Sequence, residues 1–309
     1  MTIKESEKKE YVRWAYRLFL DREPENEAVL ERNFSSAAEL RNEFMQSDEY
    51  LLNNLELHSI SKELWVLHES CYGFKIYINL NENAICWPIL YDSYEVEETK
   101  LIQSLVHSGD CVLDIGANVG YYSLLMANIV GDGGQVISFE PIPFLSEHFE
   151  KSIAENNYNN IKLHKAALSN KEGSFEMIYL PNAKNAGGSF LNTLHEKLQG
   201  HNTIDVKTMM LDRLNFEKQV TFLKMDVEGA ENLVLEGGQS FFKENRPSVL
   251  TEIHPSQLQR VSGISATDYI KKWCALGYHC YAVPNYKRKI VDWDNKTIGN
   301  LFCKHDKES

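Results

Sequence analysis

The strongest constraint on the fold of this chain is the stretch of residues 111–122, where an apolar run meets two glycines. Residues 111–115 are mostly apolar and stand between a Ser-Gly-Asp turn and Gly116, the pattern of a short, fully buried parallel strand. Apolar residues then recur at helical spacing until the glycine-rich residues 131–134. The stretch therefore predicts a strand, a glycine turn and a helix.

The turn at residues 116–120 predicts a ligand site. In open α/β sheets, ligands bind at the carboxyl ends of parallel strands, where backbone N–H groups and a helix N-terminus converge. Gly116 and Gly120 suit a turn that needs a positive φ or the close approach of a ligand to the backbone. A turn that only connects two elements is the alternative, because short glycine motifs recur by chance.

The number of residues between the turn and the next acidic strand end is informative about the ligand. Residues 135–140 predict a second strand that ends in Glu140, which stands 24 residues after Gly116. A carboxylate at this place commonly accepts hydrogen bonds from a ribose diol. A solvated carboxylate at a strand end is the alternative, but the combined spacing favours an adenosine-containing ligand.

Strand-like runs and helical patterns alternate along the rest of the chain. The expected strands are residues 161–168, 174–180, 204–208, 220–226, 247–255, 278–283 and 300–304. This order predicts an α/β fold with a mostly parallel sheet and an antiparallel edge. The polar residues 181–202 are expected to form a mobile loop over the acceptor site.

Composition narrows the classes of function. The formal net charge of the 309-residue chain is −12, which disfavours a nucleic-acid partner or an anionic membrane surface. The chain has no long apolar run and no apolar segment near its start, so we expect a cytoplasmic protein. Its six cysteines form no Cys-x-x-Cys pair, which predicts reduced thiols and neither a zinc site nor a disulfide framework.

The first part of the chain predicts a separate helical unit. An apolar stripe at helical spacing runs from Val12 to Leu20, and Asp21-Arg22-Glu23-Pro24 ends it; further helices are expected at Leu30 to Phe34 and from Ser36 to Tyr50. The motifs Tyr-x-x-Phe-Leu-x-Arg-x-Pro and Phe-Met-x-Ser-x-Glu-Tyr resemble the small helical module, related to phycobilisome linkers, that is appended to bacterial enzymes. We expect three segments: a helical appendage (1–57), a strand-containing linker or lid (58–93) and a catalytic domain (94–309).

Three motifs in one order carry a second resemblance. Residues 112–121, Phe139-Glu140-Pro141 and residues 223–231 are similar to the signature of FkbM-type S-adenosylmethionine-dependent methyltransferases. The resemblance implies a class I methyltransferase version of the Rossmann sheet, with seven strands of which one is antiparallel. It implies O-methylation of a hydroxyl on a sugar, a glycan or a glycosylated natural product.

The resemblance also implies which residues hold the cofactor. Those expected at its methionine end lie in the first motif and are Asp114, Gly116, Ala117, Asn118 and Gly120. Glu140 would hold the ribose, and Asp226 would face the transferring methyl group. The residues of the turn agree with S-adenosylmethionine as the ligand, because the turn lacks the Lys-Ser/Thr pair of a phosphate-binding loop and the third glycine of a dinucleotide-binding site. Asp114 would also repel a diphosphate.

Acidic residues and a histidine follow the two strands at 220–226 and 247–255. Asp226 and Glu228 come from one strand tip, and Glu252 and His254 from the next, so the four groups are expected in one pocket. An imidazole titrates near neutrality, which makes His254 the candidate base for the acceptor hydroxyl, with Asp226 and Glu252 beside it. A structural role for His254 is the alternative.

The same tips predict a metal site, and the motifs leave other functions open. Asp226, Glu252 and His254 are a suitable set of ligands for Mg²⁺ or Mn²⁺.

The alternatives to a sugar O-methyltransferase are an NAD(P)-dependent sugar oxidoreductase, an RNA 2′-O-methyltransferase that the net charge disfavours, and a cofactor-binding protein without catalysis. The expected partner is a small-molecule or carbohydrate acceptor, and the N-terminal helices offer a surface for docking a partner or a second copy.

Overall fold

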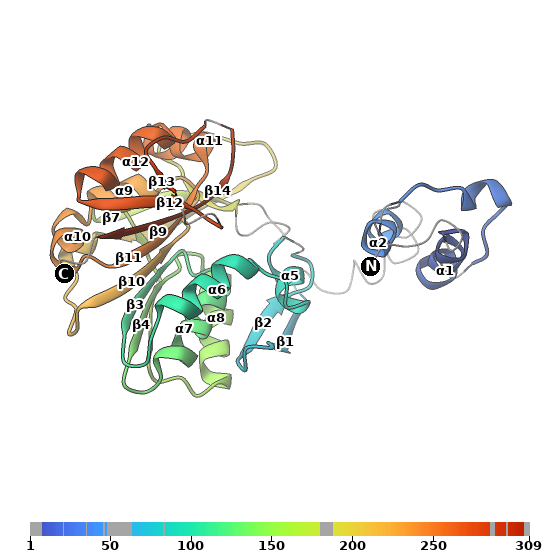
Figure 1. Cartoon of the computed structure of the whole chain (residues 1–309), viewed down its shortest axis with the longest axis horizontal. Coiled ribbons are helices and arrows are strands. Elements are labelled where there is room, and N and C mark those ends of the chain that lie inside the picture. Colours follow the sequence, from blue (N-terminus) through green and yellow to red (C-terminus); the bar gives the residue numbers. More distant parts are fainter. Residues whose placement is uncertain are drawn as a thin grey trace. The chain divides into compact units, whose positions relative to one another are not determined.

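The structure, a computed structural model, describes most of the chain. The described residues are 8–20, 22–34, 36–45, 47, 64–82, 84–179, 188–284, 288–294 and 296–305. The chain divides into two compact units, residues 1–62 and 63–309 (Figure 1). The expected boundary near residue 57 lies outside the described residues. Within the described ranges, no helix has the length and apolar character needed to cross a membrane.

The N-terminal unit has a small core of its own. Its elements are α1 (Lys8–Leu20), the 3₁₀ helix η2 (Glu27–Leu30) and α2 (Ala37–Met45). Tyr16 and Phe44 meet edge to face across α1 and α2, with ring centroids 4.9 Å apart. The expected second helix is wrong in its placement: one 3₁₀ turn begins after Asn26, whose Oδ1 accepts the N–H groups of the next turn, and it ends at Leu30.

The larger unit is built on an eight-stranded sheet. In spatial order its strands are β13 (Lys289–Ile290), β12 (Tyr278–Ala282), β14 (Gly299–His305), β11 (Ser248–Ile253), β10 (Val220–Met225), β3 (Cys111–Ile115), β4 (Gln135–Phe139) and β5 (Ile161–His164). The neighbours from β11 to β5 pair in parallel. β14 lies antiparallel between β11 and β12. The predicted mostly parallel sheet is confirmed, and the two-residue β13 extends it by one edge strand.

Helices cover both faces of this sheet (Figure 1). One face carries α6 (Val96–Leu105), α7 (Tyr121–Val130) and α8 (Pro143–Glu155); the other carries α9 (Glu231–Glu236), α10 (Gln239–Asn245) and α12 (Ala266–Ala275). β3 is buried along its whole length. Val112 packs into the first core, whereas Leu113 and Ile115 pack into the second. This alternation explains why the strand is a continuous apolar run.

A hairpin and a short helix precede the sheet in the same unit. They are β1 (Trp65–Glu69), β2 (Lys75–Asn79) and α5 (Cys86–Leu90). The hairpin docks on α8: the Lys75 N–H donates to Asn156 Oδ1 (2.8 Å) and the Tyr77 N–H donates to Ser152 Oγ (2.9 Å). The hairpin of the segment expected as a linker or lid is therefore packed against the larger unit, and a lid function stays a prediction.

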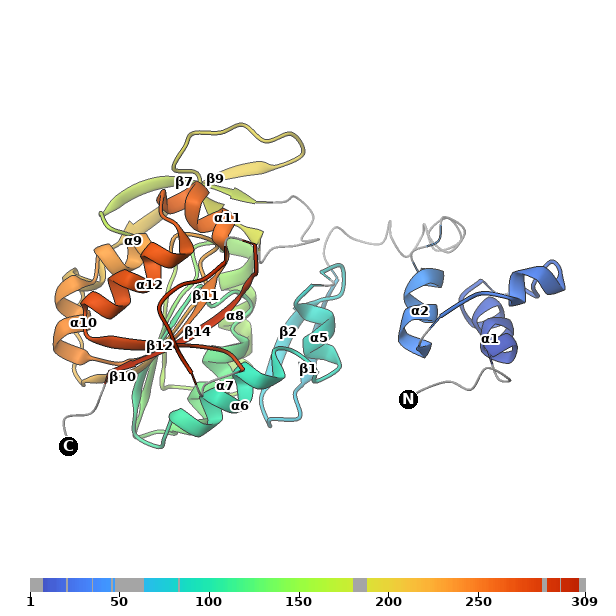
Figure 2. The same ribbon diagram turned by 45° about the horizontal axis from the view of Figure 1, so that its top comes forward.

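A second, four-stranded sheet lies beside the first (Figure 2). Its order is β6 (Ala167–Leu168), β9 (Asn202–Met209), β7 (Gly173–Tyr179) and β8 (Phe190–Leu191). The single strand expected at residues 161–168 is wrong, because the chain turns at Ala166 and β6 leaves the main sheet. Part of the expected loop forms β8, whose two residues are buried, while residues 180–187 lie outside the described part.

Candidate active site

The two glycines of the first turn are required by the protein's own packing. Gly116 and Gly120 have φ values of +81° and +91°. A Cβ on Gly116 would lie 1.9 Å from the backbone oxygen of Asp226, and one on Gly120 would lie 2.1 Å from the ring of Phe149. The expected positive φ is confirmed, but the groups that need the missing Cβ are a neighbouring strand end and a helix side chain.

The N–H groups of this turn are bonded within the protein. Those of Gly116 and Ala117 donate to the carbonyl of Phe139, both at 3.0 Å. The N–H of Asn118 donates to Glu140 Oε2 at 2.8 Å. The expectation that these N–H groups face a ligand is thus corrected, because they donate hydrogen bonds to Glu140 and to the end of β4.

Glu140 is anchored at both oxygens. Its Oε1 accepts the N–H of Ile142 at 2.8 Å, and the side chain is 4% exposed at the cavity wall. Burial raises the pKa of Glu140 to about 7, although its two backbone hydrogen bonds act in the opposite direction. Each oxygen keeps a second lone pair, which is the arrangement that a diol requires.

Asp114 lies fully buried and is not among the cavity-lining residues. Ser123 Oγ donates to its Oδ2 at 2.5 Å, while its Oδ1 has no hydrogen-bond partner among the described residues. Burial raises the pKa of Asp114. Gly120 is also absent from the lining, so of the residues expected to hold the cofactor, the cavity exposes Gly116, Ala117, Asn118, Glu140 and Asp226.

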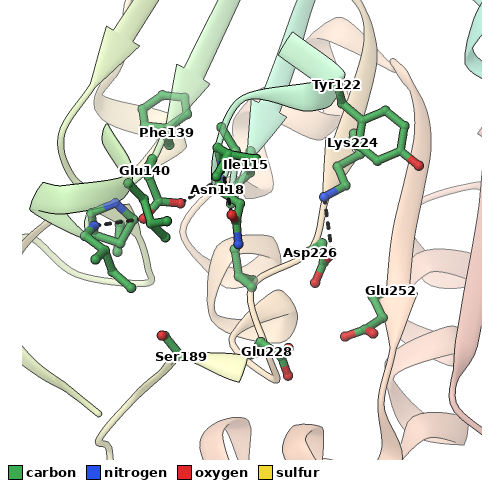
Figure 3. Close-up of a pocket in the computed structure, with 18 of the residues that line it drawn as sticks. Ile115, Asn118, Tyr122, Phe139, Glu140, Ser189, Lys224, Asp226, Glu228 and Glu252 are labelled. Carbon is green, nitrogen blue, oxygen red and sulfur yellow. Dashed lines mark hydrogen bonds and ion pairs between the residues drawn. The ribbon is translucent and has the colours of Figure 1, made fainter. Parts of the chain in front are cut away.

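The cavity, of about 240 Å³, opens at the carboxyl ends of β3, β4, β10 and β11 (Figure 3). It is strongly acidic. Lys224 is the one lysine or arginine among the described residues that line it. Its acidic lining residues, drawn from four different strand tips and loops, are Glu95, Glu140, Asp226, Glu228 and Glu252.

Lys224 and Glu95 are functional candidates that the sequence analysis missed. Lys224 Nζ lies 3.3 Å from Asp226 Oδ2 and 5.2 Å from the ring centroid of Tyr122. Tyr122 in turn donates its hydroxyl to Glu95 at 2.5 Å. Burial by itself lowers the pKa of Lys224, but the nearby carboxylates, Asp226 most strongly, outweigh this effect, so the net pKa is raised. A lysine inside an otherwise buried strand was the signal available in the sequence.

Glu228 and Glu252 complete the wall around Asp226 (Figure 3). Burial, together with the neighbouring Asp226 carboxylate, raises the pKa of both glutamates. Glu228 has a φ of +51°, a backbone region that non-glycine residues seldom occupy and that is common at functional sites. The next residue, Gly229, cannot carry a Cβ, which would lie 2.3 Å from the carbonyl oxygen of Gln257.

His254 is not brought into the cavity. β11 ends at Ile253, and Pro255 begins the single turn α11 (Pro255–Gln257). The Nδ1 of His254 accepts the Gln257 N–H at 3.5 Å and lies 3.2 Å from Ser256 Oγ. The expected convergence of His254 with Asp226 and Glu252 is therefore corrected, and the structure favours its alternative role as a helix cap. The described residues whose oxygens do gather beside Asp226 and Glu252 include Glu231 instead.

The rest of the lining comes from segments outside the main sheet. Ala84 and Ile85 follow the hairpin, Tyr94 precedes α6, and Ser189 and Leu191 come from β8 and its approach. The second sheet and the segment before α6 therefore close the cavity on the sides that the parallel strands leave open.

The strand order, with β14 antiparallel between two parallel strands, defines the class I methyltransferase version of the Rossmann sheet, and the acidic cavity lies at its ligand-binding edge. The profile of the family described as the methyltransferase FkbM domain matches residues 114–296. The chain belongs to the FkbM methyltransferase family.

Individual relatives and solved structures match this chain to different extents. A protein-L-isoaspartate O-methyltransferase of Methanococcus aeolicus is 37% identical over 94 residues, or 29% of this chain and 42% of that protein. Methyltransferase sdnD of Sordaria araneosa is 27% identical over 160 residues, covering 42% and 61%. The structure of the methyltransferase FkbM from Methylobacillus flagellatus has a TM-score of 0.40 at 13% identity, covering 66% of this chain and 50% of that one. The chain spans less than two thirds of each of these proteins.

Proposed function

We propose that the protein is an S-adenosylmethionine-dependent O-methyltransferase whose acceptor is a hydroxyl of a sugar, a glycan or a glycosylated natural product. The observation that carries the proposal is the charge of the cavity, with five carboxyl groups around Lys224. S-adenosylmethionine has a sulfonium and an ammonium group and no phosphate, so it suits such a lining. Two unit charges about 5 Å apart at a dielectric constant of about 20 interact by about 3 kcal/mol, and a nicotinamide dinucleotide would place its diphosphate against this penalty.

The lining residues fit the cofactor. Glu140, with a free lone pair on each oxygen, suits the ribose diol, and in Figure 3 it lies apart from Asp226, on the other side of Asn118. The bound cofactor would supply an electrophilic methyl group. The task of the protein is then to hold the acceptor oxygen in line behind that group, which in favourable cases accounts for about 7–11 kcal/mol of the barrier.

The acceptor end of the cavity favours a neutral, hydroxyl-bearing molecule. Asp226, Glu228 and Glu252 offer hydrogen-bond acceptors, and one of these carboxylates can take the proton that the acceptor loses. An isoaspartyl carboxylate, the acceptor that the name of one group of relatives indicates, would add a further negative charge to this wall, where burial and Asp226 already raise the pKa values of Glu228 and Glu252. A neutral polyol would add no charge and would be bound through hydrogen bonds to the same carboxyl groups.

The proposal is tested with methyl-labelled S-adenosylmethionine and a panel of nucleotide-sugars, glycosylated metabolites, isoaspartyl peptide and RNA. We expect label in at least one hydroxyl-bearing carbohydrate and none in the peptide or the RNA. Thermal melts with S-adenosylhomocysteine and with NAD⁺ distinguish the oxidoreductase alternative: stabilisation by NAD⁺ alone would reject the proposal. Binding of S-adenosylmethionine without transfer to any class of acceptor would favour the non-catalytic alternative.

A further inference from the structure

We propose that Asp226, Glu231 and Glu252 form a binding site for one divalent cation, Mg²⁺ or Mn²⁺, in the wall of the cavity. The three residues come from the end of β10, the start of α9 and the end of β11. One carboxylate oxygen from each lies within 4.8 Å of the others. Glu231 takes the place that the sequence analysis gave to His254.

Glu231 provides evidence independent of the acidic character of the cluster. Its side chain is 0% exposed, and its Oε1 accepts the Val227 N–H at 3.0 Å. Its Oε2 is buried and has no hydrogen-bond partner among the residues that the structure describes, and the same holds for Glu252 Oε2. Buried carboxylate oxygens without a partner are costly, and a cation is the ligand that satisfies two of them at once.

The three carboxylates of the cluster, when ionised, carry two more negative charges than Lys224 neutralises. Lys224 contacts Asp226 Oδ2, and among the residues that the structure describes no hydrogen bond to the other oxygen of this carboxylate is found. With all three carboxylates ionised, Lys224 compensates one of three negative charges. A divalent cation would neutralise the remainder, whereas a second lysine or an arginine is not found in the described lining.

The ligand set and its spacing indicate a hard cation. All donors are carboxylate oxygens, which suit Mg²⁺ and Mn²⁺ and not the softer metals. Metal–oxygen distances of about 2.1 Å place adjacent octahedral ligands about 3.0 Å apart and opposite ligands about 4.2 Å apart. The three oxygens, which lie within 4.8 Å of one another, would therefore move closer together when the cation binds. Asp226 and Glu252 line the cavity whereas Glu231 lies behind it, which leaves the cation open toward the acceptor side.

A cation in this position would act on the acceptor. Coordination lowers the pKa of a bound hydroxyl and orients its oxygen. This consequence rests on the proposed function, but the cation site itself does not, since it follows from the carboxylates alone.

The test is a titration of the protein with Mn²⁺, in which the electron paramagnetic resonance signal of free Mn²⁺ reports binding. We expect about one Mn²⁺ per chain, displaced by excess Mg²⁺. Glu231→Gln keeps the oxygen that accepts the Val227 N–H, and Glu252→Gln lies on a partly exposed strand end; each should weaken Mn²⁺ binding at least ~10-fold. Glu140→Gln removes the same charge from another strand tip of the cavity and should leave Mn²⁺ affinity unchanged.

Three outcomes would overturn the site: no Mn²⁺ binding by the wild-type protein, full affinity in both cluster variants, or equal weakening in the Glu140→Gln control. Circular dichroism spectra of all three variants, with S-adenosylhomocysteine titrations of the Glu231→Gln and Glu252→Gln variants, separate misfolding from the loss of a metal ligand. Mn²⁺ binding without methyl transfer would leave the site standing and reject the proposed function. Methyl transfer by a protein that binds no Mn²⁺ would do the reverse.

Discussion

The absence of a side chain at Gly116 allows the turn after β3 to pack against the end of β10, where Asp226 lies. With no Cβ there, the turn after β3 lies directly against the backbone of Asp226. Asp226, which the family resemblance implies would face the transferring methyl group, is thereby set at a fixed distance from the residues expected to hold the cofactor. The same position needs a φ of +81°, which glycine adopts without strain.

We expect Gly116→Ala to lower the free energy of unfolding by more than ~2 kcal/mol, since it combines a left-handed backbone with a clash against backbone atoms. Gly263→Ala is the matched control, because Gly263 is left-handed helical, with a φ of +65°, and no described atom lies within 4 Å of its Cβ position. It should lose only ~1 kcal/mol. Urea unfolding of the two variants measures the difference, and equal losses would reject the packing argument.

Glu140 should make cofactor affinity depend on pH. Its pKa of about 7 means that the carboxyl group gains a proton as the pH falls below 7, and the protonated form accepts fewer hydrogen bonds from a ribose. Asp114, which raises this pKa, and Lys224, which lowers it, face the same group. Calorimetric titration with S-adenosylhomocysteine should show weaker binding at pH 6 than at pH 8 in the wild type, where the two pH values bracket a pKa of about 7.

Glu140→Gln is the control for this dependence. It should weaken binding by ~1–3 kcal/mol at pH 8, through the loss of a charge-assisted acceptor. It should also remove the difference between pH 6 and pH 8 that the Glu140 pKa of about 7 predicts. Unchanged affinity in this variant would take Glu140 out of the ribose role.

His254→Ala tests the structural role that the fold favours. Loss of a cap should lower the free energy of unfolding by ~0.5–2 kcal/mol, with turnover changed less than threefold. Ser265→Ala removes the cap of α12, where Ser265 Oγ accepts the Asp268 N–H at 3.1 Å, and should behave alike. A fall in turnover of ~10²–10⁴ in the histidine variant alone would restore His254 as the general base.

At the scale of elements, the segment before α6 depends on a buried acid. Glu82 is 3% exposed, and its carboxylate accepts the N–H groups of Ala84, Ile85 and Cys86 at 2.8–2.9 Å. Ala84 and Ile85 line the cavity, so Glu82 shapes one of its sides without touching its interior. The hydrogen bonds of Glu82 are local in sequence, but the packing of the hairpin on α8 is what places Ala84 and Ile85 at the cavity.

Glu82→Ala should lower the free energy of unfolding by ~1–3 kcal/mol, because three N–H groups lose their acceptor. It should also weaken S-adenosylhomocysteine binding, since the cavity wall is released. Glu155→Ala, at an exposed position near the end of α8, is the control and should change neither quantity. Full cofactor affinity in the Glu82 variant would show that this wall is dispensable. The resemblance of the N-terminal helices to the phycobilisome-linker-related module, and their role in docking a partner, stay predictions.

At the scale of the whole molecule, stability should fall as the pH rises. The pKa values of Glu95 and Glu140 are raised to about 7 from an ordinary 4.5, mainly by burial. Between these pH values the folded state binds more protons than the unfolded state, so this contribution is complete below 4.5 and is lost as the pH passes 7. The free energy of unfolding without ligand should be higher at about pH 5 than at about pH 8.

The double variant Glu95→Gln/Glu140→Gln isolates these two groups in the same urea experiment. Its stability should vary less with pH than that of the wild type. A wild type that grows more stable from about pH 5 to about pH 8, or a double variant with an undiminished slope, would contradict the assignment.

The sequence by itself determined the elements whose signals are local. The buried strand β3, its turn and α7 follow from an apolar run, two glycines and a helical repeat. The family follows from three short motifs, and Glu140 and Asp226 from their places at strand tips. These features depend on backbone preferences and on side-chain periodicity, which neighbouring residues reveal.

Only the tertiary structure decided which groups meet. The pairing of β11 stops at Ile253 and Pro255 turns the chain, so His254 caps a helix instead of facing the cavity. Lys224 lines the cavity because β10 places it there, and Glu231, at the start of α9, lies close to Asp226 and Glu252. The chain also leaves the main sheet after His164 to start a second one. Each of these outcomes depends on contacts between segments far apart in the chain, where burial and strand pairing outweigh local preference.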